Sequence, residues 1–176
     1  GKMEQYSPDG TSVSSVSYCA DGNVYIGTGS DNIEKLDSST LSQQDVYSGH
    51  SNSPNSIIYG DDGYIYSGAS DNEIHKIDPS TMTQELAYSE HSDIVEVVEY
   101  GSDGYLYSGS WYNEVHKIDP STMSKQSSYT GHSDSLFSME FADNGYLYTG
   151  STGAEIHKLG TGWSPEPDLE GQVVAC

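Results

Sequence analysis

The amino-acid sequence predicts an all-β protein built from copies of one unit, and three observations support this. One segment returns almost unchanged, with looser copies before and after it: Asp62–Met82, Asp103–Met123, Asp21–Leu41 and Asn144–Gly160. The glycines that follow Asp or Asn in these copies are spaced 41 residues apart: Gly22, Gly63, Gly104 and Gly145. A fixed period of this size is typical of a repeat architecture. No segment shows a 3.6-residue apolar period long enough for a helix.

The second repeat shows the expected order of strands within one unit. Alternating apolar residues, rich in β-branched and aromatic side chains, predict four strands: Asn55–Tyr59, Tyr64–Gly68, Glu73–Ile77 and Gln84–Tyr88. Asp62-Gly63 separates the first two and is a strong hairpin signal, because glycine adopts positive φ without strain. Pro79 ends the third strand, since proline lacks the N–H that a ladder needs.

Two columns of aromatic residues recur with the same period. One closes the first strand of each unit, and the other lies on the fourth strand: Tyr18, Tyr59, Tyr100 and Phe141, then Tyr6, Tyr47, Tyr88 and Tyr129. Large aromatic side chains at equivalent positions are expected to pack between neighbouring sheets.

The repeat resembles the WD-repeat unit. Gly131–Leu159 has the Gly-His pair, an alternating apolar strand, Asn-Gly, and a strand ending in Thr-Gly-Ser. The resemblance covers the chain from Met3 to about Gly160, and it implies a β-propeller of four-stranded antiparallel blades, four per chain. The tryptophan of that family is replaced here by Leu36, Ile77, Ile118 and Leu159. Its turn aspartate, which bonds the histidine, is matched only by Asp71. The same stretches also resemble quinoprotein-type propeller repeats.

The number of units leaves the ring arrangement open. Residues 1–160 contain the repeats, and residues 3–6 match a fourth strand that is expected to complete the last blade. Three arrangements fit: a closed four-bladed ring, half of an eight-bladed ring made by two chains, or part of a larger propeller. Residues 161–176, with Pro165 and Pro167, are expected to form an extended tail.

The composition restricts the partners. The formal charge is −21, with six lysines and no arginine. Such a chain repels nucleic-acid phosphates and anionic membrane surfaces, so neither is expected as a partner. No apolar run is long enough to insert into a membrane. The acidic excess favours a saline or halophilic source. Extracellular, virion and halophile cytoplasmic locations all remain open.

The recurrent histidines and lysines are predicted to be structural. His50, His91 and His132 occur once per unit and are therefore expected to lie far apart, each bonding a loop to its blade rather than sharing a metal. On the third strand, His-Lys pairs recur, and their lysines are expected to pair with a carboxylate of the adjacent blade: His75-Lys76, His116-Lys117 and His157-Lys158. The acidic turns offer too few oxygens for a dedicated Ca²⁺ site. No metal or cofactor is predicted.

Trp111-Tyr112 is the sharpest signal for a binding surface. The matching turns of the other repeats are small and polar: Gly29-Ser30, Ser70-Asp71 and Thr152-Gly153. Two large aromatic residues on one turn indicate an anchor for a partner, or else packing of Trp111 onto a neighbouring blade or chain. No nucleophile elbow, phosphate-binding loop or zinc motif is present, so no catalytic residues are predicted.

The favoured function is therefore a non-catalytic scaffold or recognition module that binds protein or glycan partners through its loop face. The residues predicted on that face are Trp111, Tyr112, Asp71, His50, His91 and His132. Two other functions stay open: a structural subunit of an extracellular or virion assembly, and a quinoprotein-like or hydrolase-type enzyme using the ring axis. The axis candidates are Glu96, Glu99 and Glu140. A homodimer or a larger assembly is also compatible with the sequence.

Overall fold

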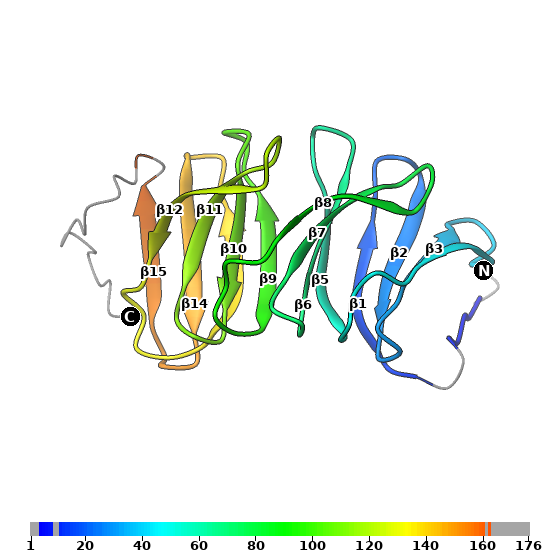
Figure 1. Ribbon diagram of the computed structural model, residues 1–176, viewed down its shortest axis with the longest axis horizontal. Helices are drawn as coiled ribbons and strands as arrows, with labels where there is room; N and C mark the ends of the chain where they lie inside the picture. Colours follow the sequence, from blue (N-terminus) through cyan, green and yellow to red (C-terminus); the bar gives the residue numbers. More distant parts are fainter. Residues whose placement is uncertain (1–3, 9–10, 161, 163–176) are drawn as a thin grey trace.

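A computed structural model describes residues 4–8, 11–160 and 162, and this part of the chain forms β-strands without any helix. The strands make four consecutive antiparallel sheets that follow one another along an arc (Figure 1). These sheets are the four predicted blades, and the all-β prediction is confirmed. With no helix among the described residues, none is available to cross a membrane.

Each blade is a meander in which successive strands are neighbours. The first blade contains β1 (Val13–Tyr18), β2 (Asn23–Thr28), β3 (Ile33–Asp37) and β4 (Gln43–Tyr47). The second contains β5 (Pro54–Tyr59), β6 (Ile65–Ala69), β7 (Ile74–Asp78) and β8 (Thr83–Tyr88). The third contains β9 (Val95–Tyr100), β10 (Leu106–Ser110), β11 (Val115–Asp119) and β12 (Ser124–Tyr129). The fourth has three strands in the described region: β13 (Leu136–Phe141), β14 (Tyr146–Ser151) and β15 (Ile156–Gly160).

The turn between the first two strands of each blade depends on its Asp-Gly or Asn-Gly pair. In the second blade, Gly63 has a φ of +85° and its N–H donates to the carbonyl of Gly60. The carboxylate of Asp62 accepts hydrogen bonds from the Tyr64 N–H at 3.3 Å and from the Tyr66 hydroxyl at 2.6 Å. Turn chemistry and the aspartate side chain thus fix the register of β5 against β6.

A lysine on the third strand links each of the first two blades to the next one. Lys76 Nζ lies 2.7 Å from Asp62 Oδ2 in its own blade and donates to the Pro120 carbonyl of the third blade at 2.9 Å. Lys35 makes the same bond to the Pro79 carbonyl at 2.7 Å. The sequence predicted a carboxylate on the adjacent blade. The carboxylate comes from the lysine's own blade instead, because the Asp-Gly turn folds over its strands.

The core lies between the blades, and Tyr100 and Phe141 of the first aromatic column pack there as predicted, whereas Tyr18 of the same column is 71% exposed. The ring of Tyr66 lies 5.7 Å from that of Tyr100, and the ring of Tyr107 lies 5.4 Å from that of Phe141. The first strands pack against one another from β1 to β5, β9 and β13, so they line the inner side of the arc. These contacts bury one apolar surface of every blade that has a described neighbour.

The two ends of the arc lie far apart. Figure 1 shows the first and last blades at opposite ends of the molecule, so the described residues do not form a closed four-bladed ring. Residues 4–8 lie beside the first blade, where the Tyr6 hydroxyl donates to Glu34 Oε2 at 2.7 Å and to Gln43 Oε1 at 3.0 Å. The expected tail at 161–176 falls outside the described residues, apart from Gly162.

Candidate functional site

Two sets of loops meet at one rim of the arc. In the second, third and fourth blades the loop before the first strand carries a histidine, and the turn between the second and third strands lies beside that loop. The backbone N–H of Trp111 donates to the Ile94 carbonyl at 3.0 Å, and the backbone N–H of Ser70 donates to the Ser53 carbonyl at 2.9 Å. We call this edge the histidine rim. All six residues predicted for the binding face belong to it: His50, Asp71, His91, Trp111, Tyr112 and His132.

In the second blade the histidine is held on both sides. Its side chain is buried, and Nδ1 of His50 lies 2.9 Å from Asp71 Oδ2 while Nε2 contacts the Ser67 hydroxyl. Asp71 also accepts the Ser51 N–H at 2.9 Å. This is the hydrogen-bond set that the resemblance implied, without the tryptophan. It supports the predicted structural role of His50.

A second histidine joins this network. The imidazole of His75 lies parallel to that of His50, with ring centroids 3.8 Å apart. His75 Nε2 lies 2.8 Å from Glu73 Oε2, and Nδ1 lies 2.6 Å from the hydroxyl of Tyr47 in the first blade. The network therefore also ties one blade to the next. The same Tyr–His–His arrangement recurs in the third and fourth blades: Tyr88, His116 and His91, then Tyr129, His157 and His132.

Sequence reasoning treated the two histidine sets separately and missed this pairing. The available signal was their constant separation of 25 residues, from His50 to His75 and likewise in the next two repeats. A separation of 25 residues does not by itself predict that the two rings touch. One residue lies on a loop and the other on a strand that does not pair with it, so the contact follows only when the path of the loop is known.

The third and fourth blades differ from the second at one position. Tyr112 and Gly153 stand where the second blade has Asp71, so one glutamate faces both histidines. Glu114 Oε2 lies 3.5 Å from His91 Nδ1 and 3.7 Å from His116 Nε2. Nδ1 of His91 and Nδ1 of His132 are buried without a hydrogen-bond partner.

These buried imidazoles resist protonation. Burial lowers the pKa of His91 to about 2 and that of His116 to about 4, and in His91 the neighbouring His116 adds to the effect. Burial and then His157 lower the pKa of His132 to about 4. The pKa of His75 is lowered as well, chiefly by burial and then by His50. Near neutral pH these four rings are uncharged and act as hydrogen-bonding groups.

Each histidine pair and its acid could be considered as a metal site. Three potential ligand atoms lie within 4.8 Å of one another in each set: His50, Asp71 and His75; His91, Glu114 and His116; His132, Glu155 and His157. The paired rings are within 11° of parallel and about 4 Å apart. Their nitrogen lone pairs therefore run side by side, whereas ligands of a tetrahedral ion must converge on it. The geometry fits a hydrogen-bonded network better.

An exposed aromatic patch lies above this network. Trp111 and Tyr112 are 43% and 67% exposed, and Phe137 on β13 is 51% exposed. Trp111 Nε1 donates to Glu96 Oε2 at 3.0 Å, and its ring lies 6.4 Å from that of Phe137. Trp111 thus contacts the neighbouring blade and still presents almost half of its surface to solvent. We call Trp111, Tyr112 and Phe137 the aromatic patch.

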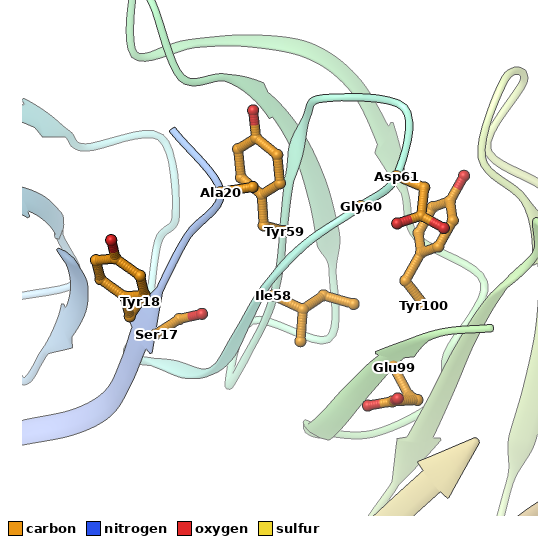
Figure 2. A pocket seen from close by; sticks show the side chains of 9 residues that line it. All are labelled: Ser17, Tyr18, Ala20, Ile58, Tyr59, Gly60, Asp61, Glu99 and Tyr100. Atoms are coloured by element: carbon orange, nitrogen blue, oxygen red, sulfur yellow. The ribbon is translucent and has the colours of Figure 1, made fainter. Parts of the chain in front are cut away.

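A hollow of about 490 Å³ lies at the opposite ends of the inner strands (Figure 2). Tyr18, Tyr59 and Tyr100 line it together with Asp61 and Glu99, and its lining contains no basic side chain. Burial and then the charge of Glu140 raise the pKa of Glu99 to about 7. Of the carboxylates named for the ring axis, Glu99 therefore lines the hollow, whereas Glu96 is engaged by Trp111 at the other rim.

Comparisons with known proteins identify the fold. No family model and no curated protein matches the sequence. The structure is similar to the WD40 repeats of RRP9 and to U3-55K, each with a TM-score of 0.83, 17% identity and 95% of this chain covered. It is also similar to a chain of a mitotic checkpoint complex, with a TM-score of 0.78, 22% identity and 86% coverage. The match covers 52%, 53% and 48% of those chains, respectively. The chain therefore has the fold of a WD40-type β-propeller and spans about half the length of these structures.

Proposed function

We propose that this protein is a non-catalytic recognition module whose aromatic patch binds a protein partner. The exposed pair Trp111-Tyr112 carries this proposal, since every other repeat has small or polar residues on that turn. Trp and Tyr are enriched among the residues that contribute most to protein–protein binding. Contiguous exposed aromatic surface on a rim of polar loops is typical of an interaction site.

The buried residues of the rim have a supporting part in this proposal. His50, His91 and His132 are buried, and the Asp71 side chain is nearly so. A partner would therefore touch the aromatic patch, while the imidazoles hold the loops beneath it. Trp111 is fixed by its bond to Glu96 and by Phe137, so little side-chain freedom is lost on binding.

The charge of the chain favours one kind of partner surface. With a formal charge of −21 and Glu96 beside Trp111, the patch is complementary to an apolar segment flanked by basic residues. Aromatic rings also stack on sugars, which is the other partner class that the sequence allowed. A protein and a glycan can be separated by direct binding measurements.

The test uses a random-peptide display library and an array of neutral oligosaccharides. The matched variant is Trp111→Ser with Tyr112→Asp, which reproduces the Ser70-Asp71 turn of the second blade and should fold well. Peptides selected on the wild-type protein should lose roughly tenfold or more in affinity for this variant. If they bind both proteins equally, the patch is not the site. If the wild-type protein binds an oligosaccharide and the variant does not, the partner of the aromatic patch is a glycan and not a protein.

A further inference from the structure

The inner strands of the first three blades form a hollow that the aromatic patch does not use. Ser17 on β1, Ile58 on β5 and Glu99 on β9 stand at equivalent positions of the repeat and line this hollow together (Figure 2). Its volume is about 490 Å³, and pockets for small ligands usually have about 300–1,000 Å³. We call it the inner hollow, and it has room for a small organic molecule.

The lining of the inner hollow combines apolar surface with negative charge. Ile58, Tyr59 and Tyr100 supply apolar surface, and all three side chains are partly buried. Asp61, on the turn after β5, and Glu99 supply carboxylates. Burial and then the charges of nearby aspartates raise the pKa values of Tyr59 and Tyr100, so both phenols are neutral near pH 7. A cation with an apolar body matches both parts of this lining.

No lysine of the described chain lines the inner hollow or neutralises its carboxylates. The chain contains no arginine. The described lysines all contact partners elsewhere in the blades: Lys35, Lys76, Lys117, Lys125 and Lys158. Negative charge on a half-buried, partly apolar wall is therefore left without a positive group from the described residues, and a bound cation would compensate it.

Glu99 is the carboxylate whose charge is least compensated. Burial and then the charge of Glu140 on β13 raise the pKa of Glu99 to about 7, although a hydrogen bond from the backbone of Phe141 opposes this shift. The other titratable groups around it are Asp61 and the tyrosines of the lining, together with Tyr107 opposite it on β10. All of them are acids or neutral phenols, so an ammonium group beside Glu99 would meet attraction and no repulsion.

An inorganic ion matches the inner hollow less well than an organic cation. Ca²⁺ binds about six to eight oxygens at close range. The hollow offers two carboxylates on separate elements, Asp61 on a turn and Glu99 on a strand, beside a wall that includes Ile58. A bare ion would leave that apolar wall in water, whereas an aliphatic chain would cover it.

We propose that the inner hollow binds a small alkylammonium ion, whose charged group pairs with Glu99 while its aliphatic chain covers Ile58 and the adjacent tyrosine rings. The hollow lies at the opposite ends of the inner strands from the aromatic patch, so this site does not depend on the proposed protein partner. Burial of the aliphatic chain supplies affinity, and the carboxylate selects for positive charge. The formal charge of −21 also attracts cations to the protein.

An NMR titration of the whole chain with pentylammonium chloride, at constant ionic strength and pH 8.0, tests this proposal. The signals of Ile58, Glu99 and Tyr100 should shift and reach saturation. Neutral 1-pentanol, which has the same number of heavy atoms, should bind roughly tenfold more weakly because it lacks the charge. Methylammonium should also bind at least about tenfold more weakly, because it lacks the aliphatic chain.

Two outcomes of the titration would overturn the proposal. If methylammonium binds as tightly as pentylammonium, the inner hollow only collects counter-ions. If Nα-acetyl-lysine amide binds there and pentylammonium does not, the occupant is a lysine side chain of a partner and not a free amine.

A pair of matched variants tests the part assigned to Glu99. Glu99→Gln should weaken pentylammonium binding roughly tenfold, because it removes the charge and keeps the shape of the side chain. Glu85→Gln is the control, since it removes the same charge from an exposed position on the outer strand β8 and should bind pentylammonium as the wild type does. Equal affinities of the wild type and Glu99→Gln would contradict the pairing with Glu99.

The pH dependence of binding gives a second readout for the same pairing. With its pKa at about 7, Glu99 is mostly protonated at pH 6.0 and mostly ionised at pH 8.0, whereas an alkylammonium ion stays charged at both. Wild-type affinity for pentylammonium should therefore rise about tenfold from pH 6.0 to pH 8.0. In Glu99→Gln the affinity should stay constant over this range, and a rise of the same size there would refute the proposal.

Discussion

The second and third blades contain the same Tyr–His–His network, but they differ in the acid that supports it. In the second blade, Asp71 bonds His50 and Glu73 bonds His75, so each histidine has its own carboxylate. In the third blade, Tyr112 replaces that aspartate, Glu114 stands between two histidines, and Nδ1 of His91 has no hydrogen-bond partner.

This difference separates what holds the rim together from what the rim displays. Losing the aspartate leaves a buried nitrogen unsatisfied, which costs about 1–3 kcal/mol. The same position gains a tyrosine that is 67% exposed and lies beside Trp111. A residue that lowers stability and adds exposed aromatic surface is what a binding site is expected to contain.

Acid should affect the third and fourth blades most. Below about pH 6.5, histidines become protonated in the unfolded chain but stay neutral in the folded chain. Their contribution to the free energy of unfolding is therefore fully present above that pH, and it is lost as the pH falls toward the lowered pKa values. The pKa of His91 is about 2, and those of His116 and His132 are about 4. The contribution of each of these histidines to the free energy of unfolding should therefore fall by about 2 kcal/mol between pH 7.5 and pH 5.0. Urea unfolding at the two pH values measures the sum.

Glu99 changes stability with pH in the opposite direction from the histidines, so its substitution isolates the effect of the histidines. Because the pKa of Glu99 is raised to about 7, its contribution to the free energy of unfolding is fully present below its pKa in the unfolded chain. That contribution is lost as the pH rises through 7. In a Glu99→Gln background the loss at pH 5.0 should therefore be larger. If unfolding free energy in that background is the same at pH 5.0 and 7.5, the buried histidines are not the acid-sensitive groups.

Removing the acid from each blade should give unequal losses. Asp71→Ala leaves His50, the Ser51 N–H and the Glu73 N–H without their acceptor, so a loss of about 2–3 kcal/mol is expected. Glu114→Ala should cost about 1 kcal/mol or less, because its contacts are at 3.5 Å or longer. Urea unfolding at pH 7.5 compares the two. Equal losses would mean that the networks are equally strong.

Restoring the aspartate should give the smallest effect and a gain. Tyr112→Asp provides an acceptor for Nδ1 of His91, as Asp71 does for His50, and should raise stability by about 1 kcal/mol. Tyr112→Ala is the control, since it removes the ring without adding a carboxylate. Thermal unfolding measures both variants. A gain in the alanine variant would attribute the effect to the loss of exposed aromatic surface instead.

Local sequence predicted the elements because each is determined by neighbouring residues. Asp62-Gly63 predicted its hairpin, and the recurrence of the aromatic residue at Tyr100 and Phe141 predicted aromatic packing between blades. The His50–His75 stack was not predicted, because it depends on how a loop crosses a strand. The exposure of Val16 was not predicted either: its sequence context matches that of Ile57, and only the presence of a neighbouring blade distinguishes the two.

The lysine bonds between blades give the arc a direction. Lys35 and Lys76 each reach forward to a proline carbonyl in the following blade, and Lys76 is largely buried. When either blade of such a pair opens, the bond between them is lost. The ammonium group then keeps the aspartate of its own blade and becomes accessible to water, and the proline carbonyl loses its donor. Since repeat stability includes such nearest-neighbour terms, each of these bonds makes the stability of one blade depend on the presence of its neighbour.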